Sequence, residues 1–111
     1  MSFDVIVTNS FERKFKRLTK KHKSLIGDLT SLIEELSENP TIGVPIGKDC
    51  YKIRLAITSK GKGKSGGARV ITFVRIINQT VFLMDIYDKS EQVTISGKEL
   101  QMLIDILQQD E

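Results

Sequence analysis

Seven positively charged side chains between residues 48 and 69 are the strongest chemical signal in this sequence. A single acid, Asp49, opposes them. The seven are Lys48, Lys52, Arg54, Lys60, Lys62, Lys64 and Arg69. Positive charge at this density in a folded segment favours an anionic partner, and nucleic-acid phosphate is the commonest one. We therefore predict a site for polyphosphate in this segment.

Within this set, Lys52 and Arg54 have the spacing most specific for a phosphate site. They lie two residues apart in a predicted strand at 51–57, so their side chains point to the same side, roughly 6.5–7 Å apart. This distance is comparable to the phosphate spacing of an extended single strand. Arg69 opens the next predicted strand across a hairpin and is expected to converge on the same site. The alternative is a solvated strand face, on which Lys and Arg are common.

A glycine- and lysine-rich segment at 60–67 joins these two strands. Gly61 to Gly66 formally matches the G-x-G-x-x-G dinucleotide pattern, but that mechanism requires a following helix, and a strand is predicted here. We interpret the segment as a flexible hairpin tip, with a merely solubilising loop as the alternative. Lysines at such a tip add salt-dependent attraction to RNA without reading its bases. The expected RNA contacts are Lys48, Lys52, Arg54, Lys60, Lys62 and Lys64.

Few other side chains support catalysis. Tyr87 ends a predicted buried strand, where it could stack on a base, exchange a proton or only cap the strand. His22 is expected at the surface between two helices. Cys50 has no cluster of Cys and His around it, so no metal site is expected. With one histidine in the chain and no serine beside a base, serine- or cysteine-type nucleophilic catalysis has no support.

Length and composition favour one domain covering residues 1–111. Hydrophobic content is 40%, which is enough for a modest core. One cysteine forms no internal disulfide, and the N-terminus is not signal-like, so a cytoplasmic location is expected. No apolar stretch approaches the ~20 residues of a membrane helix, and no membrane partner is expected. A second basic cluster at 13–23, with acids elsewhere, predicts a molecule with two electrostatic faces.

The N-terminal part of the chain predicts a strand followed by two helices. Residues 3–8 are short and β-branched, as in a strand. Ser10 is expected to cap the first helix. The second helix carries an apolar stripe from Leu25 to Leu36, and Asn39-Pro40 stops it because the residue before proline leaves helical geometry.

The rest of the chain predicts a loop, three strands and a closing helix. The loop covers 41–49, and a continuous apolar run at 81–87 indicates a central strand buried on both faces. Ser96 and Glu99 form a capping box for the last helix. The expected fold is α+β, with an antiparallel-dominated sheet of about four strands. Its element order is strand, helix, helix, strand, strand, strand, helix.

Several segments together resemble a known family. Cys50-Tyr-Lys-Ile-Arg-Leu55 and Gly66-Gly-Ala-Arg-Val-Ile71 are similar to the core of the RelE/HigB toxins, in the RelE/ParE superfamily of toxin–antitoxin systems. Asn39-Pro40 and Ile86-Tyr-Asp-Lys-Ser-Glu91 extend the likeness over nearly the whole chain. The resemblance implies a RelE-like fold and a ribosome-dependent endoribonuclease, or mRNA interferase, that cuts mRNA in the ribosomal A site. It also implies a cognate antitoxin and no cofactor.

The resemblance also implies roles for particular residues. Basic residues at the positions of Lys52, Arg54 and Arg69 hold RNA phosphates and take part in cleavage. The chain departs from RelE after its last strand, where Asp88-Lys89-Ser90 stands with no later tyrosine. Proton transfer or positioning therefore falls to Tyr87 or Lys89. Ribosomal RNA contacts are expected from the first helix, through Arg13, Lys14, Lys16, Arg17, Lys20 and Lys21.

Two other functions compete with the nuclease. ParE-like members of the superfamily act on DNA gyrase without cutting RNA, but they lack the clustered Lys-x-Arg and the hairpin arginine found here. A plain binding module is the second alternative, in which the basic hairpin binds RNA or an acidic antitoxin and cuts nothing.

Overall fold

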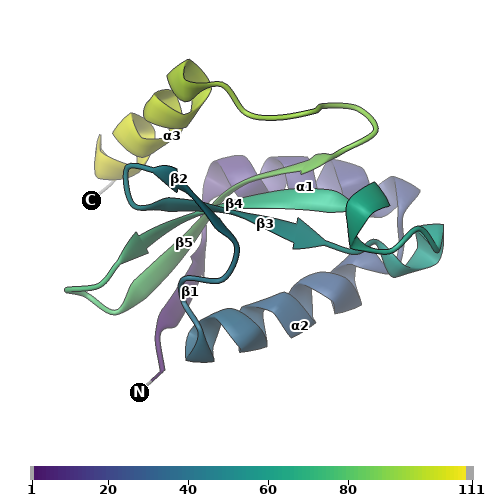
Figure 1. The fold of residues 1–111 in the computed structure, drawn as a ribbon, viewed down its shortest axis with the longest axis horizontal. Helices are drawn as coiled ribbons and strands as arrows, with labels where there is room; N and C mark the ends of the chain where they lie inside the picture. Colours follow the sequence, from purple (N-terminus) through teal and green to yellow (C-terminus); the bar gives the residue numbers. More distant parts are fainter. Residues whose placement is uncertain (1, 110–111) are drawn as a thin grey trace.

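A computed structural model describes residues 2–109 as a five-stranded sheet covered by helices on both faces (Figure 1). The strand order is β1-β5-β4-β3-β2, and only β1 and β5 pair in parallel. The α+β, antiparallel-dominated architecture is thus confirmed. The elements are β1 Asp4–Val7, α1 Asn9–Lys21, α2 Leu25–Glu38, β2 Val44–Gly47, β3 Cys50–Leu55, β4 Ala68–Arg75, β5 Thr80–Asp88 and α3 Gly97–Gln109.

The expected strand number was one too low, because β2 lies inside the segment predicted as a loop. Pro45 argued against a strand in the sequence, because proline cannot donate a ladder hydrogen bond. Proline is accepted in an edge strand, and β2 lies at the edge of the sheet. The β2–β3 turn is equally unusual in sequence. Lys48 and Asp49 both have positive φ, at 56° and 62°, as in a two-residue hairpin turn that normally carries Asn and Gly.

Helix boundaries follow the predictions closely, with one wrong cap. Thr8, and not Ser10, caps α1: its Oγ1 accepts from the Phe11 amide at 3.3 Å. Ser10 lies inside the helix and donates its hydroxyl to the Met84 carbonyl at 3.0 Å. The α2 helix ends at Glu38, immediately before Asn39-Pro40, as expected. At α3, the Ser96 hydroxyl accepts from the Glu99 amide at 3.1 Å, which confirms the predicted cap.

The core has two parts, one on each face of the sheet. The first packs α1 and α2 against alternate strand residues such as Ile53 and Leu55, and the second packs α3 against residues such as Ile71 and Phe73. Every residue of β5 is buried, as expected for a central strand. β3 ends at Leu55, before the end of the strand predicted at 51–57. β4 ends at Arg75, so Ile76 and Ile77 lie in an exposed turn. Within residues 2–109, no helix has the length and apolar character to cross a membrane.

Candidate active site

One cross-strand row joins three of the predicted site residues. Arg54 of β3 lies directly opposite Arg69 of β4, and Arg69 lies opposite Tyr87 of β5. Directly opposed residues share a face of the sheet, with Cβ atoms about 4.5–5.5 Å apart. Lys52 occupies the same face two residues along β3, opposite Ile71. The prediction that Arg69 meets the Lys52–Arg54 strand across the hairpin is therefore confirmed at the level of strand register.

A β-bulge determines which way Tyr87 faces. Thr72 pairs with Leu83 but Ile71 pairs with Asp85, so Met84 is an extra residue in β5 with no partner in β4. Because of this insertion the side-chain alternation of β5 shifts by one. Ile86 therefore joins the α1/α2 side, whereas Tyr87 joins Met84 on the α3 side with Arg69. Without the bulge, Tyr87 would face away from the cations.

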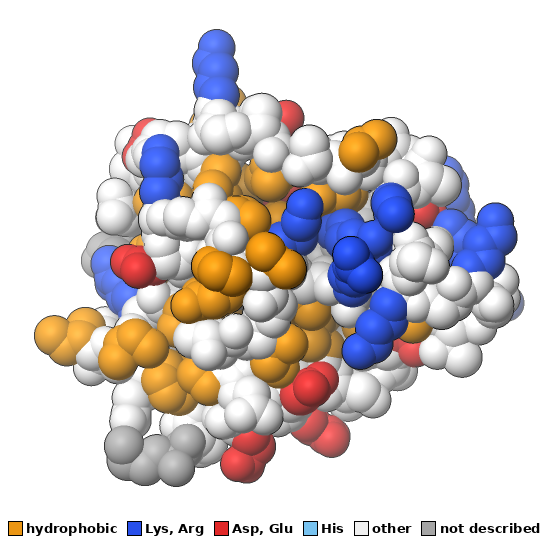
Figure 2. Space-filling model, in the orientation of Figure 1, with side chains coloured by type: hydrophobic (Ala, Val, Ile, Leu, Met, Phe, Trp, Pro, Cys, Tyr) orange, Lys and Arg blue, Asp and Glu red, His pale blue; other side chains and the backbone are white. Residues whose placement is uncertain are grey.

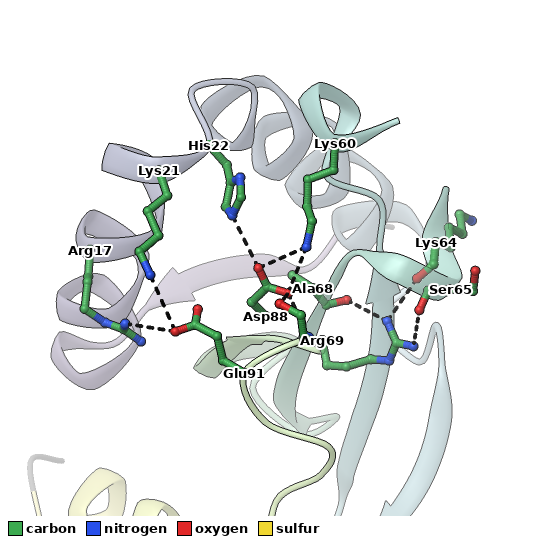
Figure 3. Close-up of polar contacts among 11 residues, drawn as sticks. Arg17, Lys21, His22, Lys60, Lys64, Ser65, Ala68, Arg69, Asp88 and Glu91 are labelled. Atoms are coloured by element: carbon green, nitrogen blue, oxygen red, sulfur yellow. Dashed lines mark hydrogen bonds and ion pairs between the residues drawn. The ribbon is translucent and has the colours of Figure 1, made fainter. Parts of the chain in front are cut away.

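Arg69 is turned into the molecule rather than outward. Its side chain is 5% exposed. One terminal nitrogen donates to the carbonyls of Lys64 and Ala68 at 3.0 and 3.1 Å, and the other donates to the Ser65 carbonyl at 3.3 Å (Figure 3). The guanidinium thus fixes the loop between β3 and β4. A direct contact between Arg69 and RNA stays a prediction.

Tyr87 is covered in this conformation. Its side chain is 3% exposed and packs with Leu100 and Ile104 of α3, and its hydroxyl makes no hydrogen bond within the part of the chain described. Burial raises the pKa of Tyr87, while the nearby Thr94 hydroxyl and the Arg69 charge offset part of the rise. A proton-transfer role would require the covering segment to move.

Four predicted site cations lie along β3 and in the following loop with their side chains at least partly open to solvent. Arg54, Lys62 and Lys64 are exposed, and Lys52 is half-buried. Arg54 and Lys64 line one groove of about 220 Å³, together with Asp28 and Glu35 of α2. Figure 2 shows positively charged side chains gathered on this face beside apolar ones. These side chains can reach an extended polyanion without rearrangement.

The loop between β3 and β4 is not the open hairpin tip we expected. It folds into two short 3-10 turns, Thr58–Lys60 and Lys64–Gly66. Asp28 of α2 holds the first turn by accepting from the amide and the hydroxyl of Thr58, at 3.0 and 2.5 Å. The Ser59 amide donates to the Ser24 hydroxyl at 2.9 Å. Arg69 holds the second turn, so both halves of the loop are anchored.

Asp88 forms a buried hub that sequence reasoning missed. Its carboxylate accepts from Lys60 Nζ at 3.2 Å and lies 3.3 Å from His22 Nε2, and the amide and hydroxyl of Ser90 donate to it at 2.9 and 2.8 Å (Figure 3). Burial alone would raise the pKa of Asp88, but the hydrogen bonds from Ser90 and Lys60 lower it to about 2. Asp88 therefore ties α1, the loop and β5 together.

Two residues at this hub are less exposed than the sequence predicted. His22 is only 17% exposed and contacts Asp88, so the expectation of a surface histidine was wrong. Lys60, predicted to contact RNA, points inward and is also 17% exposed. The only signal for the hub in the sequence was a lone histidine among lysines. Its partner, Asp88, is distant in the sequence, so no local pattern reveals the contact.

Two further predicted site residues, Lys48 and Lys89, lie outside the cross-strand row. Lys48 donates to the Gln101 side chain of α3, which links the β2–β3 turn to the last helix. Lys89 is exposed, and its amide donates to the Gly67 carbonyl at 3.1 Å. Their roles toward RNA stay predictions. Among residues 2–109, no three His, Cys, Asp or Glu side chains are grouped so as to hold a metal ion.

Most of the basic side chains of α1 have acidic neighbours. Lys14 lies 2.6 Å from Asp85, Lys16 pairs with Glu12 at 3.2 Å, and Arg17 and Lys21 share one Glu91 oxygen at 3.5 and 3.6 Å. Arg13 and Lys20 make no ion pair with the residues that the structure describes. The predicted ribosomal RNA contacts thus start from a surface on which three acids offset part of the charge of six cations.

Comparisons with known proteins agree on one family. The family model described as the RelE toxin of the RelE/RelB toxin–antitoxin system matches residues 10–109 of the chain. That match spans the row of Arg54, Arg69 and Tyr87, the anchored loop and all three helices.

Solved structures of E. coli RelE share the fold, each with a TM-score of 0.60. The isolated toxin is 18% identical, and the match covers 95% of this chain and 99% of that one. A free toxin with two arginines replaced by alanine is 20% identical, with coverage of 84% and 90%. The intact RelBE toxin–antitoxin complex matches at 20% identity, over 78% of this chain and 96% of the matched chain.

Proposed function

The chain belongs to the RelE toxin family of toxin–antitoxin systems, and on that premise we propose that it is a ribosome-dependent endoribonuclease. It would cleave mRNA in the ribosomal A site and thereby stop translation. The observation that carries the proposal is the cross-strand row of Arg54, Arg69 and Tyr87, with Lys52 beside it. Two arginines from adjacent strands would supply positive charge of the kind that a transferring phosphate needs.

The cleavage step can be written with the chain and its RNA substrate as the only reacting partners. The RNA 2′-oxygen attacks the adjacent phosphorus while its proton leaves to a base, and the bond to the 5′-oxygen breaks as that oxygen takes a proton from an acid. The products are a cyclic phosphate and a 5′-hydroxyl. Lys52 and Arg54 would hold the phosphate, and the Arg69 charge would stabilise the developing negative charge across the row. Tyr87 or Lys89 would position groups or carry the proton.

The ribosome would supply what this sparse site lacks. Positioning a reacting 2′-oxygen in line with its phosphate can remove several kcal/mol from a barrier. The buried Tyr87 and the inward Arg69 fit an enzyme that becomes competent only when it binds the ribosome. Ribosome and mRNA are therefore proposed partners, in the cytoplasm, together with an antitoxin such as the one in the RelBE complex that the fold matches.

Primer extension on a message in a reconstituted translation system tests the proposal. Wild type should give codon-spaced cuts, and Arg54→Ala should cleave about 100- to 1000-fold more slowly, as expected when a charge-stabilising donor is lost. Lys98→Ala is the matched control, because Lys98 is an exposed cation on α3. It should cleave like wild type. An intact message at every wild-type concentration would overturn the proposal.

The covered state of Tyr87 favours a second candidate, an RNA-binding module that does not cut. In this conformation Lys52, Arg54, Lys62 and Lys64 are open to RNA, and the tyrosine hydroxyl is not. Translation arrest with an intact message would identify this function in the same assay. Gyrase-dependent DNA breaks with normal translation would instead identify a toxin of the ParE type.

A further inference from the structure

A groove of about 450 Å³ separates α1 from α3, and none of its lining residues belongs to the Arg54–Arg69–Tyr87 row. Its two walls differ in chemistry. The α1 wall is cationic and the α3 wall is apolar. The lining residues used below are Arg13, Lys14 and Arg17 on the first wall and Met102, Leu103 and Ile106 on the second.

The apolar wall is a second hydrophobic stripe on α3 that the core does not use. Leu100, Ile104 and Leu107 are the α3 residues buried against the sheet. Met102 and Ile106 lie four residues apart on another face, and they are 53% and 46% exposed. Helical residues four apart form neighbours on one surface. Neighbouring exposed apolar side chains that line a groove are a common mark of a protein contact.

The cationic wall keeps a surplus of positive charge. Arg13 and Arg17 also lie four residues apart, and Arg13 has no ion pair among residues 2–109. The acids near this wall are Asp85, which is buried and held by Lys14, and Glu91, which Arg17 shares with Lys21. Of the three lining cations, Arg13 has no ion pair among residues 2–109 and Arg17 shares Glu91 with Lys21, so the wall stays positive.

We propose that this groove is the docking site for an acidic amphipathic helix of the cognate antitoxin. The inference rests on the proposed function, because it names a surface for that function's silencing partner. The complementary helix would place apolar residues at i and i+4 on Met102 and Ile106 and carboxylates against Arg13 and Arg17. Helix-in-groove recognition of this kind uses a short row of apolar anchors, here about two to three helical turns.

RNA fits the groove less well than such a helix does. Single-stranded RNA binds proteins through base stacking on aromatic rings and through phosphate contacts. Met102 and Ile106 have no aromatic ring on which a base could stack, and their apolar side chains cannot form a polar contact with phosphate. The cationic wall alone would suit RNA, but the two walls together suit a protein with one apolar and one acidic face.

Occupation of the groove would explain how an antitoxin silences the enzyme from a distance. Arg13, Lys14 and Arg17 are among the α1 cations expected to contact ribosomal RNA. A helix held against them would exclude the ribosome while leaving Lys52 and Arg54 uncovered. Silencing would then act on ribosome docking and not on the cross-strand row.

A fluorescent synthetic peptide tests the groove without RNA or ribosomes. The probe has about 14 residues, with leucines at i, i+4 and i+7 and glutamates on the neighbouring face. Its Kd by fluorescence anisotropy should rise at least about tenfold in Ile106→Glu and in Arg13→Glu, as expected when a central anchor or its charge partner is reversed. Ile77→Glu is the control: Ile77 is 91% exposed in the β4–β5 turn and its variant should stay within twofold.

The possible outcomes separate the inference from the nuclease proposal. Equal peptide affinity in wild type and Ile106→Glu would overturn the docking site, even if mRNA is cleaved. Groove-dependent peptide binding by a protein that cuts no message would support the docking site and remove only the nuclease. Loss of binding to an RNA hairpin, but not to the peptide, in Ile106→Glu would identify an RNA site and overturn the inference. If circular dichroism shows Ile106→Glu unfolded, Met102→Glu replaces it under the same criteria.

Discussion

Two regions of this molecule are equally basic in sequence and differ in structure. Four of the six α1 cations form ion pairs, and the four share three acids, Glu12, Asp85 and Glu91. The cations of the β3–β4 hairpin divide into two groups. Lys60 and Arg69 are turned inward as anchors, whereas Arg54, Lys62 and Lys64 remain exposed.

A count of positive charges in the sequence therefore does not show which of those charges are available to a ligand. Lys14 and its partner Asp85 are 71 residues apart in the sequence, so no local window reveals the neutralisation. In the β3–β4 hairpin, by contrast, Lys60 and Arg69 point inward and hold the loop backbone in place, while the other cations point outward. Anchoring and binding are thus divided among cations that the sequence shows as one cluster.

The largest expected effect comes from removing the anchor that holds the loop. Asp88→Asn keeps the shape of the side chain but leaves Lys60 and His22 without their carboxylate. Loss of one partner from a mostly buried charge cluster should lower the free energy of unfolding by about 2–3 kcal/mol. Urea denaturation measures the change. Glu91→Gln, which removes exposed pairs to Arg17 and Lys21, should cost less than about 0.5 kcal/mol.

The pH dependence of unfolding sharpens this result. The pKa of Asp88 is about 2 in the folded chain against an ordinary value of 3.8. A carboxyl with a lowered folded-state pKa stabilises the protein above its unfolded-state pKa, and this contribution fades as the pH falls through the folded-state value. Wild type should therefore lose about 2 kcal/mol between pH 4 and pH 2 through this group. Asp88→Asn should lack that loss, and identical acid profiles would contradict the ionised anchor.

A smaller effect should separate two lysines of the same helix. Lys14→Ala leaves Asp85 buried at 1% exposure, with one carboxylate oxygen already lacking a hydrogen-bond partner among the described residues. Since Lys14 is itself 40% exposed, we expect destabilisation of about 1–2 kcal/mol in thermal or urea unfolding.

Lys16→Ala is the matched control for Lys14→Ala. It removes only the exposed pair with Glu12 and should cost less than about 0.5 kcal/mol. Equal losses in the two variants would show that Lys14 and Asp85 do not form a buried pair in solution.

The sequence predicted the elements of the fold better than their details. Apolar periodicity located three helices and the central strand, because each buries a continuous face. Pro45 and the Lys48–Asp49 turn hid β2, since both depart from the residue preferences of strands and hairpins. The bulge at Met84 was also invisible, because a strand that is apolar on both faces shows no alternation to interrupt.

The site could be predicted as far as strand register and no further. Spacing within strands implied that Lys52 and Arg54 share a side, and a simple hairpin implied that Arg69 lies across from them. The inward turn of Arg69 depends on where the carbonyls of Lys64 and Ser65 lie, which is a property of the folded loop. The Asp88 hub depends on three segments meeting in space. Neither arrangement has a local sequence signature.

The smallest effect tests the comparison of the two basic regions directly. Binding to a single-stranded RNA oligonucleotide should weaken with salt, and each lost phosphate contact should reduce the slope of log K against log salt by about 0.7. Lys62 is exposed with no ion pair among the described residues, whereas Lys16 pairs with Glu12. Lys62→Ala should therefore lower the slope by that amount, and Lys16→Ala should leave it unchanged. Equal slopes in the two variants would mean that RNA responds to net charge alone, and the distinction between free and neutralised cations would have no bearing on binding.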